Sequence, residues 1–143
     1  MTDHSTDYAA ISLAEKMLRR HEGLRLFVYQ CSQGYQTIGV GRNLESRGIS
    51  ADEAELMLAN DIEAAVADLQ TFPWWTGLTP GRKAALIDFR FNVGAGGVRN
   101  FKKMLAALEV RDYQEAAAQL LDSKYARQVG HRAKELADLL VAG

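Results

Sequence analysis

Apolar residues recur at helical spacing in the first part of the chain. Between residues 8 and 22 they fall on one face of a helix, at Tyr8, Ile11, Ala14, Met17 and Leu18. This spacing predicts an amphipathic helix over residues 8–22. Asp7 precedes it as the expected N-cap, and Gly23 follows it as the expected C-terminal stop.

The pattern changes from helical spacing to alternation after Gly23. Over residues 24–29 the leucines and the valine alternate with Arg25, Phe27 and Tyr29, which is typical of a short strand. The segment 32–34 (SQG) has the composition of a turn, and residues 35–41 (YQTIGVG) resemble a second strand. We therefore predict a β-hairpin over residues 24–41.

The remainder of the chain is helical in pattern. Ser50 and Glu53 form a capping box that opens a long helix, and Thr79-Pro80 opens another. Three short amphipathic helices are predicted to follow. The apolar stripes of these five helices are Leu58, Ile62, Ala65, Val66 and Leu69; Ala85, Leu86 and Phe89; Phe101, Met104, Leu105 and Leu108; Tyr113, Ala116, Ala117, Leu120 and Leu121; and Ala133, Leu136, Ala137, Leu140 and Val141.

The order of elements predicts a single domain over residues 1–143 with two lobes. The small lobe holds the hairpin and covers about residues 23–60. The mainly helical lobe covers about residues 1–22 and 61–143, and the long helix joins the two. A length of 143 residues and a hydrophobic content of 48% suffice for a core without metal or disulfide support.

Charge and targeting signals narrow the possible partners. The net charge of −1 lacks the basic excess expected of a nucleic-acid-binding protein. The first residues show no basic segment followed by an apolar one, and no apolar run reaches the ~18–20 residues of a membrane span. We expect no signal peptide, no membrane insertion and no nucleic-acid partner.

Three side chains around the hairpin are candidates for chemistry. Glu22 stands at the end of the first helix, where the negative end of the helix dipole favours a carboxyl group that keeps its proton, as a general acid does. Cys31 is the single cysteine and lies in a polar turn, and Thr37 lies within the second strand. Each also has a plain structural reading: a solvated acid, a bystander thiol and a β-branched strand residue.

Metal and protease chemistry have little support. The chain has three histidines, His4, His21 and His131, and neither CxxC nor HExxH spacing. A cysteine–histidine pair between Cys31 and His21 or His131 is conceivable, but no protease signature surrounds the cysteine. We expect no metal and no cofactor.

Taken together, several segments resemble the phage-type lysozymes, the glycoside hydrolase family that includes T-even phage lysozyme. The resemblance covers about residues 12–140. It rests on HEGLRLFVY, GYQTIGVG, the DEAE of the long helix, RKAALIDFRFNVG with GGVRNF after it, and HRAKE. The most specific element is Glu, eight residues, a catalytic-base position, five residues and Thr, which falls on Glu22, Cys31 and Thr37.

The resemblance implies an α+β lysozyme-like fold and a role for each of these residues. Glu22 corresponds to the general acid that protonates the glycosidic oxygen, and Thr37 to the residue that holds the attacking water. Arg132 matches an arginine that pairs with the catalytic glutamate. Phe91 and Asn92 fall where the family lines its cleft. Arg42 and Asp61 match a structural ion pair.

The departure from the family pattern is Cys31, because the usual residue there is an aspartate that activates water. The reference pKa of a cysteine is ~8.5, so a few percent is thiolate at neutral pH. No adjacent Lys, Arg or His is visible in the sequence to lower it. Cys31 can be a base or nucleophile, can position water without strong basicity, or can mark lost hydrolysis. We favour the first two.

These implications combine into one functional prediction. The chain is expected to be an endolysin, a muramidase that hydrolyses the β-1,4 bond between N-acetylmuramic acid and N-acetylglucosamine in bacterial peptidoglycan and so lyses the host cell. A monomer made in the host cytoplasm and released to the wall through a holin-type pore is expected. The alternatives are a lytic transglycosylase that leaves 1,6-anhydro ends, a catalytically weak wall-binding protein, and a secreted effector.

Overall fold

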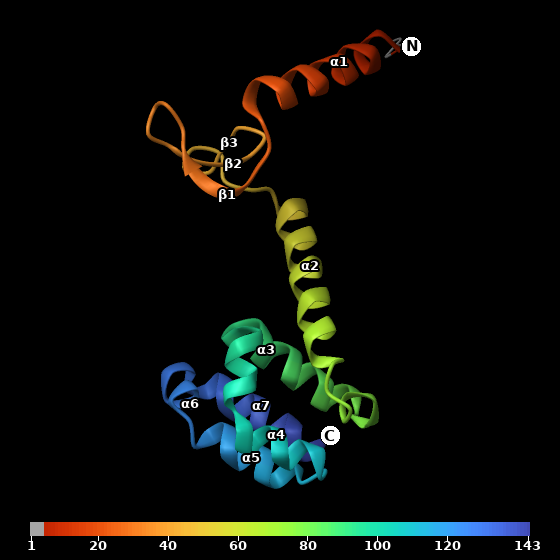
Figure 1. The fold of residues 1–143 in the computed structure, drawn as a ribbon, viewed down its shortest axis with the longest axis vertical. Helices are drawn as coiled ribbons and strands as arrows, with labels where there is room; N and C mark the ends of the chain where they lie inside the picture. The colour runs from red at the N-terminus through yellow and green to blue at the C-terminus, as the bar shows by residue number, and fades with distance from the viewer. Residues whose placement is uncertain (1–4) are drawn as a thin grey trace. The chain divides into compact units, whose positions relative to one another are not determined.

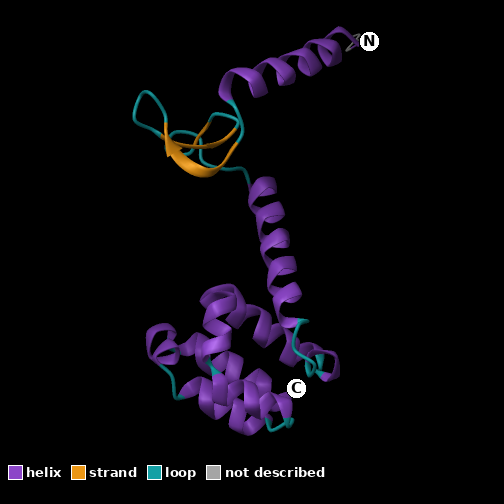
Figure 2. Ribbon diagram, viewed as in Figure 1, coloured by secondary structure: helices purple, strands orange, loops and turns teal. Residues whose placement is uncertain are grey.

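The computed structural model describes residues 5–143. The elements are α1 (Ser5–Glu22), β1 (Arg25–Gln30), β2 (Gln36–Gly39), β3 (Arg42–Asn43), α2 (Ala51–Leu69), the 3-10 turn η1 (Trp75–Gly77), α3 (Pro80–Asn100), α4 (Lys102–Glu109), α5 (Tyr113–Leu121), α6 (Lys124–Val129) and α7 (His131–Ala142). Figure 2 shows the three strands as one small sheet in a chain that is otherwise helical. The chain divides into two compact units, residues 1–54 and 55–143, and the boundary falls in the first turn of α2. The predicted assignment of residues 1–22 to the helical lobe stays a prediction.

The N-terminal unit consists of α1 and an antiparallel sheet in the order β1-β2-β3. The predicted first helix ends at Glu22 as expected, but it begins at Ser5, so Asp7 lies in its first turn and the N-cap prediction is wrong. Residues 1–4 lie outside the described part of the chain. They include the start of the segment from which the absence of a signal peptide was predicted.

The hairpin is confirmed, with one strand more than predicted. Tyr29 of β1 is opposite Thr37 of β2, and Thr37 is in turn opposite Asn43 of β3. The predicted second strand, residues 35–41, ends early because Gly39 and Gly41 adopt φ values of +70° and +66° and reverse the chain into β3. Such left-handed values suit glycine and end a strand.

The capping box at the start of α2 is present. The Ser50 hydroxyl accepts a hydrogen bond from the Glu53 N–H at 3.1 Å, and the Glu53 carboxylate accepts one from the Ser50 N–H at 3.0 Å. The predicted start of α3 is also confirmed, since the Thr79 hydroxyl accepts from the Arg82 N–H at 3.3 Å. Capping hydrogen bonds between residues three positions apart therefore determine where both helices begin.

The C-terminal unit is a helical bundle in which α7 packs against α3 and α5, and α4 packs against α5 (Figure 1). Its core centres on Phe89, whose ring meets the edges of Phe101 and Tyr125 at centroid distances of 4.8 and 5.2 Å. The predicted stripes supply most of the other buried side chains, namely Leu69, Ala85, Leu86, Met104, Leu108, Ala116, Ala117, Leu120, Ala133, Leu136, Ala137 and Leu140. Helix α6 was not predicted; Ser123 caps its start by accepting from the Ala126 N–H at 3.1 Å.

Candidate active site

Glu22 is the last residue of α1. The helix stops there because Gly23 adopts a φ of +72°, and its N–H donates to the Arg19 carbonyl at 3.0 Å. This is a glycine C-cap, and it fixes the backbone from which the Glu22 side chain extends. The side chain lies against the backbone of Gly41 in the turn between β2 and β3. The helix end and the sheet therefore position this acid together.

Cys31 follows β1 directly and opens the turn between β1 and β2. Its N–H donates to the Tyr35 carbonyl at 2.9 Å, and its carbonyl accepts from the Gly34 N–H at 2.8 Å. The Gln30 side-chain amide adds a hydrogen bond to the Gly34 carbonyl at 3.2 Å. Three hydrogen bonds therefore close the turn that begins at Cys31, and Cys31 is half-buried.

The surroundings of Cys31 lower the pKa of its thiol below the ordinary value. The largest cause is a main-chain hydrogen bond from Tyr35, followed by one from Gln33, while partial desolvation acts in the opposite direction. The Thr37 hydroxyl and the Gly34 main chain contribute smaller effects that also lower the pKa. Consecutive N–H groups in a tight turn form a concavity that favours an anion. The structure therefore offers a way to stabilise the thiolate that needs no Lys, Arg or His neighbour.

Thr37 is the one buried polar residue among the described residues, with 3% of its surface exposed. Its hydroxyl donates to the Tyr35 carbonyl at 2.8 Å and also hydrogen-bonds to the thiol of Cys31. A hydroxyl has one proton, so Thr37 donates either to the carbonyl or to the thiolate. The structure therefore brings Cys31 and Thr37 together.

An ion pair between Arg42 and Glu53 stabilises the turn that contains Gly41. The Arg42 guanidinium contacts both carboxylate oxygens of Glu53, at 2.9 and 2.8 Å, and donates to the Gly48 carbonyl at 3.1 Å. The Arg42 guanidinium and the Ser50 amide hold the pKa of Glu53 at about 2. Arg42 thus pairs with Glu53, the residue that also closes the capping box. Asp61, the partner that the resemblance implies, belongs to the other compact unit, and the Arg42–Asp61 pair stays a prediction.

The other predicted site residues belong to the C-terminal unit. Arg132 is the second residue of α7, and its Nε donates to Asp88 of α3 at 2.8 Å; this hydrogen bond is the main reason that the pKa of Arg132 is raised. Phe91 and Asn92 are exposed residues of α3. Phe91 and Arg132 line a groove of about 450 Å³ with Leu58, Ile62, Ala84, Ile87 and Asp88. Its apolar wall and single ion pair suit a ligand with both apolar and polar faces.

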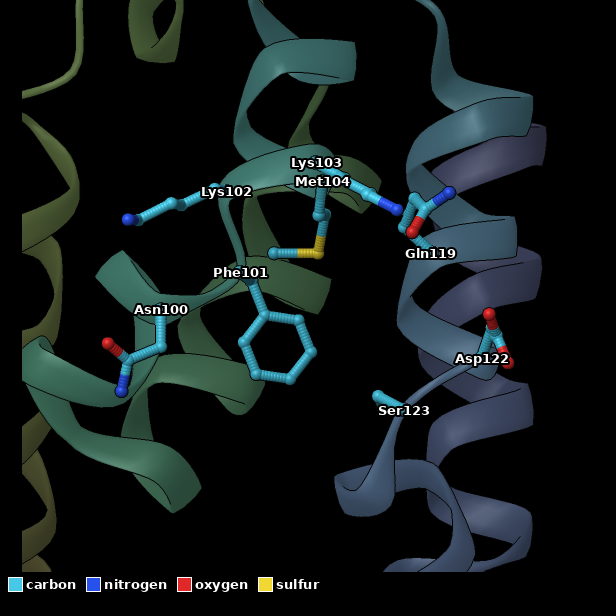
Figure 3. Close-up of a pocket in the computed structure, with 8 residues that line it drawn as sticks. All are labelled: Asn100, Phe101, Lys102, Lys103, Met104, Gln119, Asp122 and Ser123. Atoms are coloured by element: carbon cyan, nitrogen blue, oxygen red, sulfur yellow. The ribbon is translucent and has the colours of Figure 1, made fainter.

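Sequence reasoning gave no role to two features of this unit. A pocket of about 380 Å³ lies between α4 and α5, and Figure 3 shows Phe101 and Met104 facing it, with the Lys103 ammonium near Gln119. The full lining is Asn100, Phe101, Lys102, Lys103, Met104, Gln119, Asp122 and Ser123. The hydroxyl of Tyr125 is buried and has no hydrogen-bond partner among residues 5–143. The adjacent Lys102 and Lys103 were a signal in the sequence for the pocket, but nothing in the sequence indicates that the Tyr125 hydroxyl is buried.

Within residues 5–143, no three side chains of the His, Cys, Asp or Glu type are grouped so that they could bind a metal ion. None of the helices in this part of the chain combines the length and the apolar character that crossing a bilayer requires.

A comparison with protein families finds a match to the phage lysozyme family over residues 19–139, which is most of the chain. The chain belongs to the phage lysozyme family. An endolysin of Acyrthosiphon pisum secondary endosymbiont phage 1 is 34% identical and aligns with 81% of this chain and 80% of its own length. The probable T4-type lysozyme 1 of Dictyostelium discoideum is 25% identical over 93% of this chain and 96% of its own length.

A third relative is longer than this chain. The pre-baseplate central spike protein Gp5 of Enterobacteria phage T4 is 29% identical over 96% of this chain, and this chain spans 29% of that protein's length. Membership of the family confirms the predicted α+β lysozyme-like fold and the predicted enzyme class, a lysozyme-type glycoside hydrolase. The roles of the individual site residues stay predictions.

Proposed function

We propose that this phage lysozyme-family chain is a peptidoglycan muramidase that cleaves the β-1,4 bond between N-acetylmuramic acid and N-acetylglucosamine. The observation that carries the proposal is the environment of Cys31. The position where the family pattern has an aspartate holds a thiol whose pKa is lowered by main-chain N–H groups of its own turn. A group that ionises readily at this position is what hydrolysis requires.

In the proposed reaction Glu22 and the Cys31 thiolate act on opposite sides of the bond. Glu22 gives its proton to the glycosidic oxygen, and the leaving sugar departs with a free hydroxyl. Cys31 takes a proton from a water molecule whose oxygen attacks the anomeric carbon, and Thr37 orients that water. The water is consumed, a reducing end is formed, and the anomeric configuration is inverted.

The C-terminal unit is proposed to hold the glycan. Phe91 offers an exposed ring for the apolar face of a sugar, and Asn92 offers an amide for its hydroxyl and acetamido groups. Arg132, held by Asp88 at 2.8 Å, orients a polar group of the substrate. Phe91→Ala and Asn92→Ala are expected to raise KM for peptidoglycan while leaving kcat nearly unchanged.

The decisive experiment measures hydrolysis of purified peptidoglycan by wild type, Glu22→Gln, Cys31→Asp and Cys31→Ala. Glu22→Gln should be inactive, Cys31→Asp active, and Cys31→Ala strongly impaired. Alkylation of the thiol should inhibit wild type but not Cys31→Asp, because Cys31 is the sole cysteine. Full activity of Cys31→Ala would remove the thiol from the mechanism.

Product analysis separates hydrolysis from the competing reactions. Inverted reducing ends support Cys31 as a base, whereas retained configuration means that Cys31 attacks the anomeric carbon itself. A 1,6-anhydro end would identify a lytic transglycosylase. Wall binding without cleavage by wild type would indicate a wall-binding protein.

We further propose that the enzyme is a monomeric endolysin that accumulates in the cytoplasm of the host bacterium and reaches the wall through a holin-type pore. Expression with and without a pore-forming protein tests this route. Lysis should follow only when the pore is present, and lysis without it would mean that the chain crosses the membrane by another path.

A further inference from the structure

Two glycines, Gly39 at the end of β2 and Gly41 in the turn before β3, have similar φ values but different surroundings. Gly39 and Gly41 have φ values of +70° and +66°. A Cβ atom added at Gly39 would meet no other atom within 4 Å in the part of the chain that the structure describes. A Cβ atom added at Gly41 would lie 2.8 Å from Oε2, 2.9 Å from Cδ and 3.0 Å from Cγ of Glu22.

These distances mean that the Glu22 carboxyl group occupies the space that a side chain at position 41 would need. Gly23 ends α1 and fixes the Glu22 backbone, whereas the side chain itself rotates about several bonds. A methyl group at position 41 would therefore displace the carboxyl group before it disrupted the helix.

The surface that receives the carboxyl group is well supported. Ile38 pairs with Arg42 across the turn, and Arg42 is held by Glu53 and by the Gly48 carbonyl. Gly41 stands directly before this anchored arginine. The turn is thus a defined support and not a loose loop that could shift away from an added methyl group.

We propose that Gly41 is a positioning residue for the acid of the reaction: its missing side chain leaves the space in which the Glu22 carboxyl group is held against the β2–β3 turn. The inference rests on the proposed role of Glu22 as general acid. A general acid must lie within hydrogen-bond reach of the oxygen that it protonates, and a displacement of ~1 Å can cost on the order of 100-fold in rate.

The experiment compares Gly41→Ala with Gly39→Ala, because both variants place an alanine in the same left-handed backbone region. Both should lose similar stability from this strain. Only Gly41→Ala should lose kcat by about tenfold or more, with KM nearly unchanged. Equal loss of kcat in the two variants, or full activity of Gly41→Ala, would overturn the inference.

Two further measurements keep the test decisive. The carbon NMR chemical shift of the Glu22 carboxyl group should change in Gly41→Ala but not in Gly39→Ala, because only the first variant displaces the group, whether or not the enzyme turns over. Any additional instability of Gly41→Ala should disappear when Glu22→Ala removes the steric clash, and its persistence counts against the contact.

Glu22→Gln separates the two proposals. If Glu22→Gln keeps full hydrolysis, the role of Glu22 fails, and the NMR comparison still decides whether Gly41 places the carboxyl group. If Glu22→Gln is inactive while Gly41→Ala keeps full kcat, the proposed function stands and the positioning role is wrong.

Discussion

Replacement of Thr37 by valine should separate the catalytic role of its hydroxyl from its structural role. Valine has the same shape and carries a methyl group in place of the hydroxyl, so the buried packing of a residue that is 3% exposed is kept. The change removes the hydrogen bond to the Tyr35 carbonyl at 2.8 Å and the hydrogen bond to the Cys31 thiol. It leaves the backbone pairing of β2 intact.

The contacts of Thr37 determine how much stability and how much activity the valine variant should lose. A neutral intramolecular hydrogen bond contributes about 0.5–1.5 kcal/mol to folding, and the Tyr35 carbonyl keeps its hydrogen bond from the Cys31 N–H in the variant. The free energy of unfolding should fall by about 1 kcal/mol, which a protein of ordinary stability tolerates. One lost hydrogen bond to a reacting group corresponds to about a tenfold change in rate, and Thr37 touches both the thiolate and the proposed water. We expect kcat to fall by about tenfold to 100-fold.

Thr37→Ser is the matched control, because it keeps the hydroxyl and loses a buried methyl group at a cost of about 1 kcal/mol. Urea unfolding should place the two variants close together in stability. Release of reducing ends from purified peptidoglycan should separate them, with serine near wild type and valine strongly impaired. If the valine variant is as active as the serine variant, Thr37 is a structural strand residue and the reasoning about its hydroxyl is wrong.

Three further predictions follow from the charged groups. The lowered pKa of Cys31 means that thiolate absorbance, alkylation rate and activity should rise together at a lower pH than for an ordinary cysteine; a normal titration would contradict the turn as a thiolate-stabilising environment. The pKa of Glu53 is about 2, below its ordinary value of 4.5, so its stabilising contribution is complete above pH 4.5 and is lost as the pH falls from 4.5 toward 2. Glu53→Gln should therefore show a flatter dependence of unfolding on pH in this interval, and an unchanged slope would refute the pairing. Arg82 donates to the Leu140 and Val141 carbonyls at 2.8 and 3.1 Å. Arg82→Met should therefore destabilise the C-terminal unit by about 1–2 kcal/mol in thermal unfolding, and Arg82→Lys should have an intermediate effect. Unchanged stability of Arg82→Met would show that these contacts do not stabilise the fold.

Local patterns predicted most of the helices and much of the core. The starts of α2 and α3 follow from Ser50 and Thr79, since a cap depends on residues three positions apart. The apolar stripes predicted buried positions such as Leu86 and Leu136, because one face of an amphipathic helix must meet the core. Other stripe positions are exposed: Leu121 and Val141 at helix ends are 47% and 45% exposed, Ile11 and Leu18 within α1 are 54% and 51% exposed, and Leu58 within α2 is 42% exposed.

Several features that depend on the folded backbone were not predicted. Strand β3 has two residues and no periodicity to detect, and α6 is a short helix between Ser123 and Gly130. The ion pair between Arg42 and Glu53 was also missed, because it depends on how the folded turn presents the arginine. These outcomes depend on the path of the backbone, which short-range spacing does not report.

The candidate site also has features that the sequence determined and features that only the folded structure revealed. The sequence by itself determined the motif of Glu22, Cys31 and Thr37, because the family resemblance and the order of helix end, turn and strand are linear properties of the chain. Only the tertiary structure decided what surrounds each group: the N–H groups that lower the pKa of Cys31, and the bare Gly41 backbone on which the Glu22 carboxyl group rests. Electrostatic and steric effects act through space over a few ångströms, so they exist only once the turn and the sheet have closed.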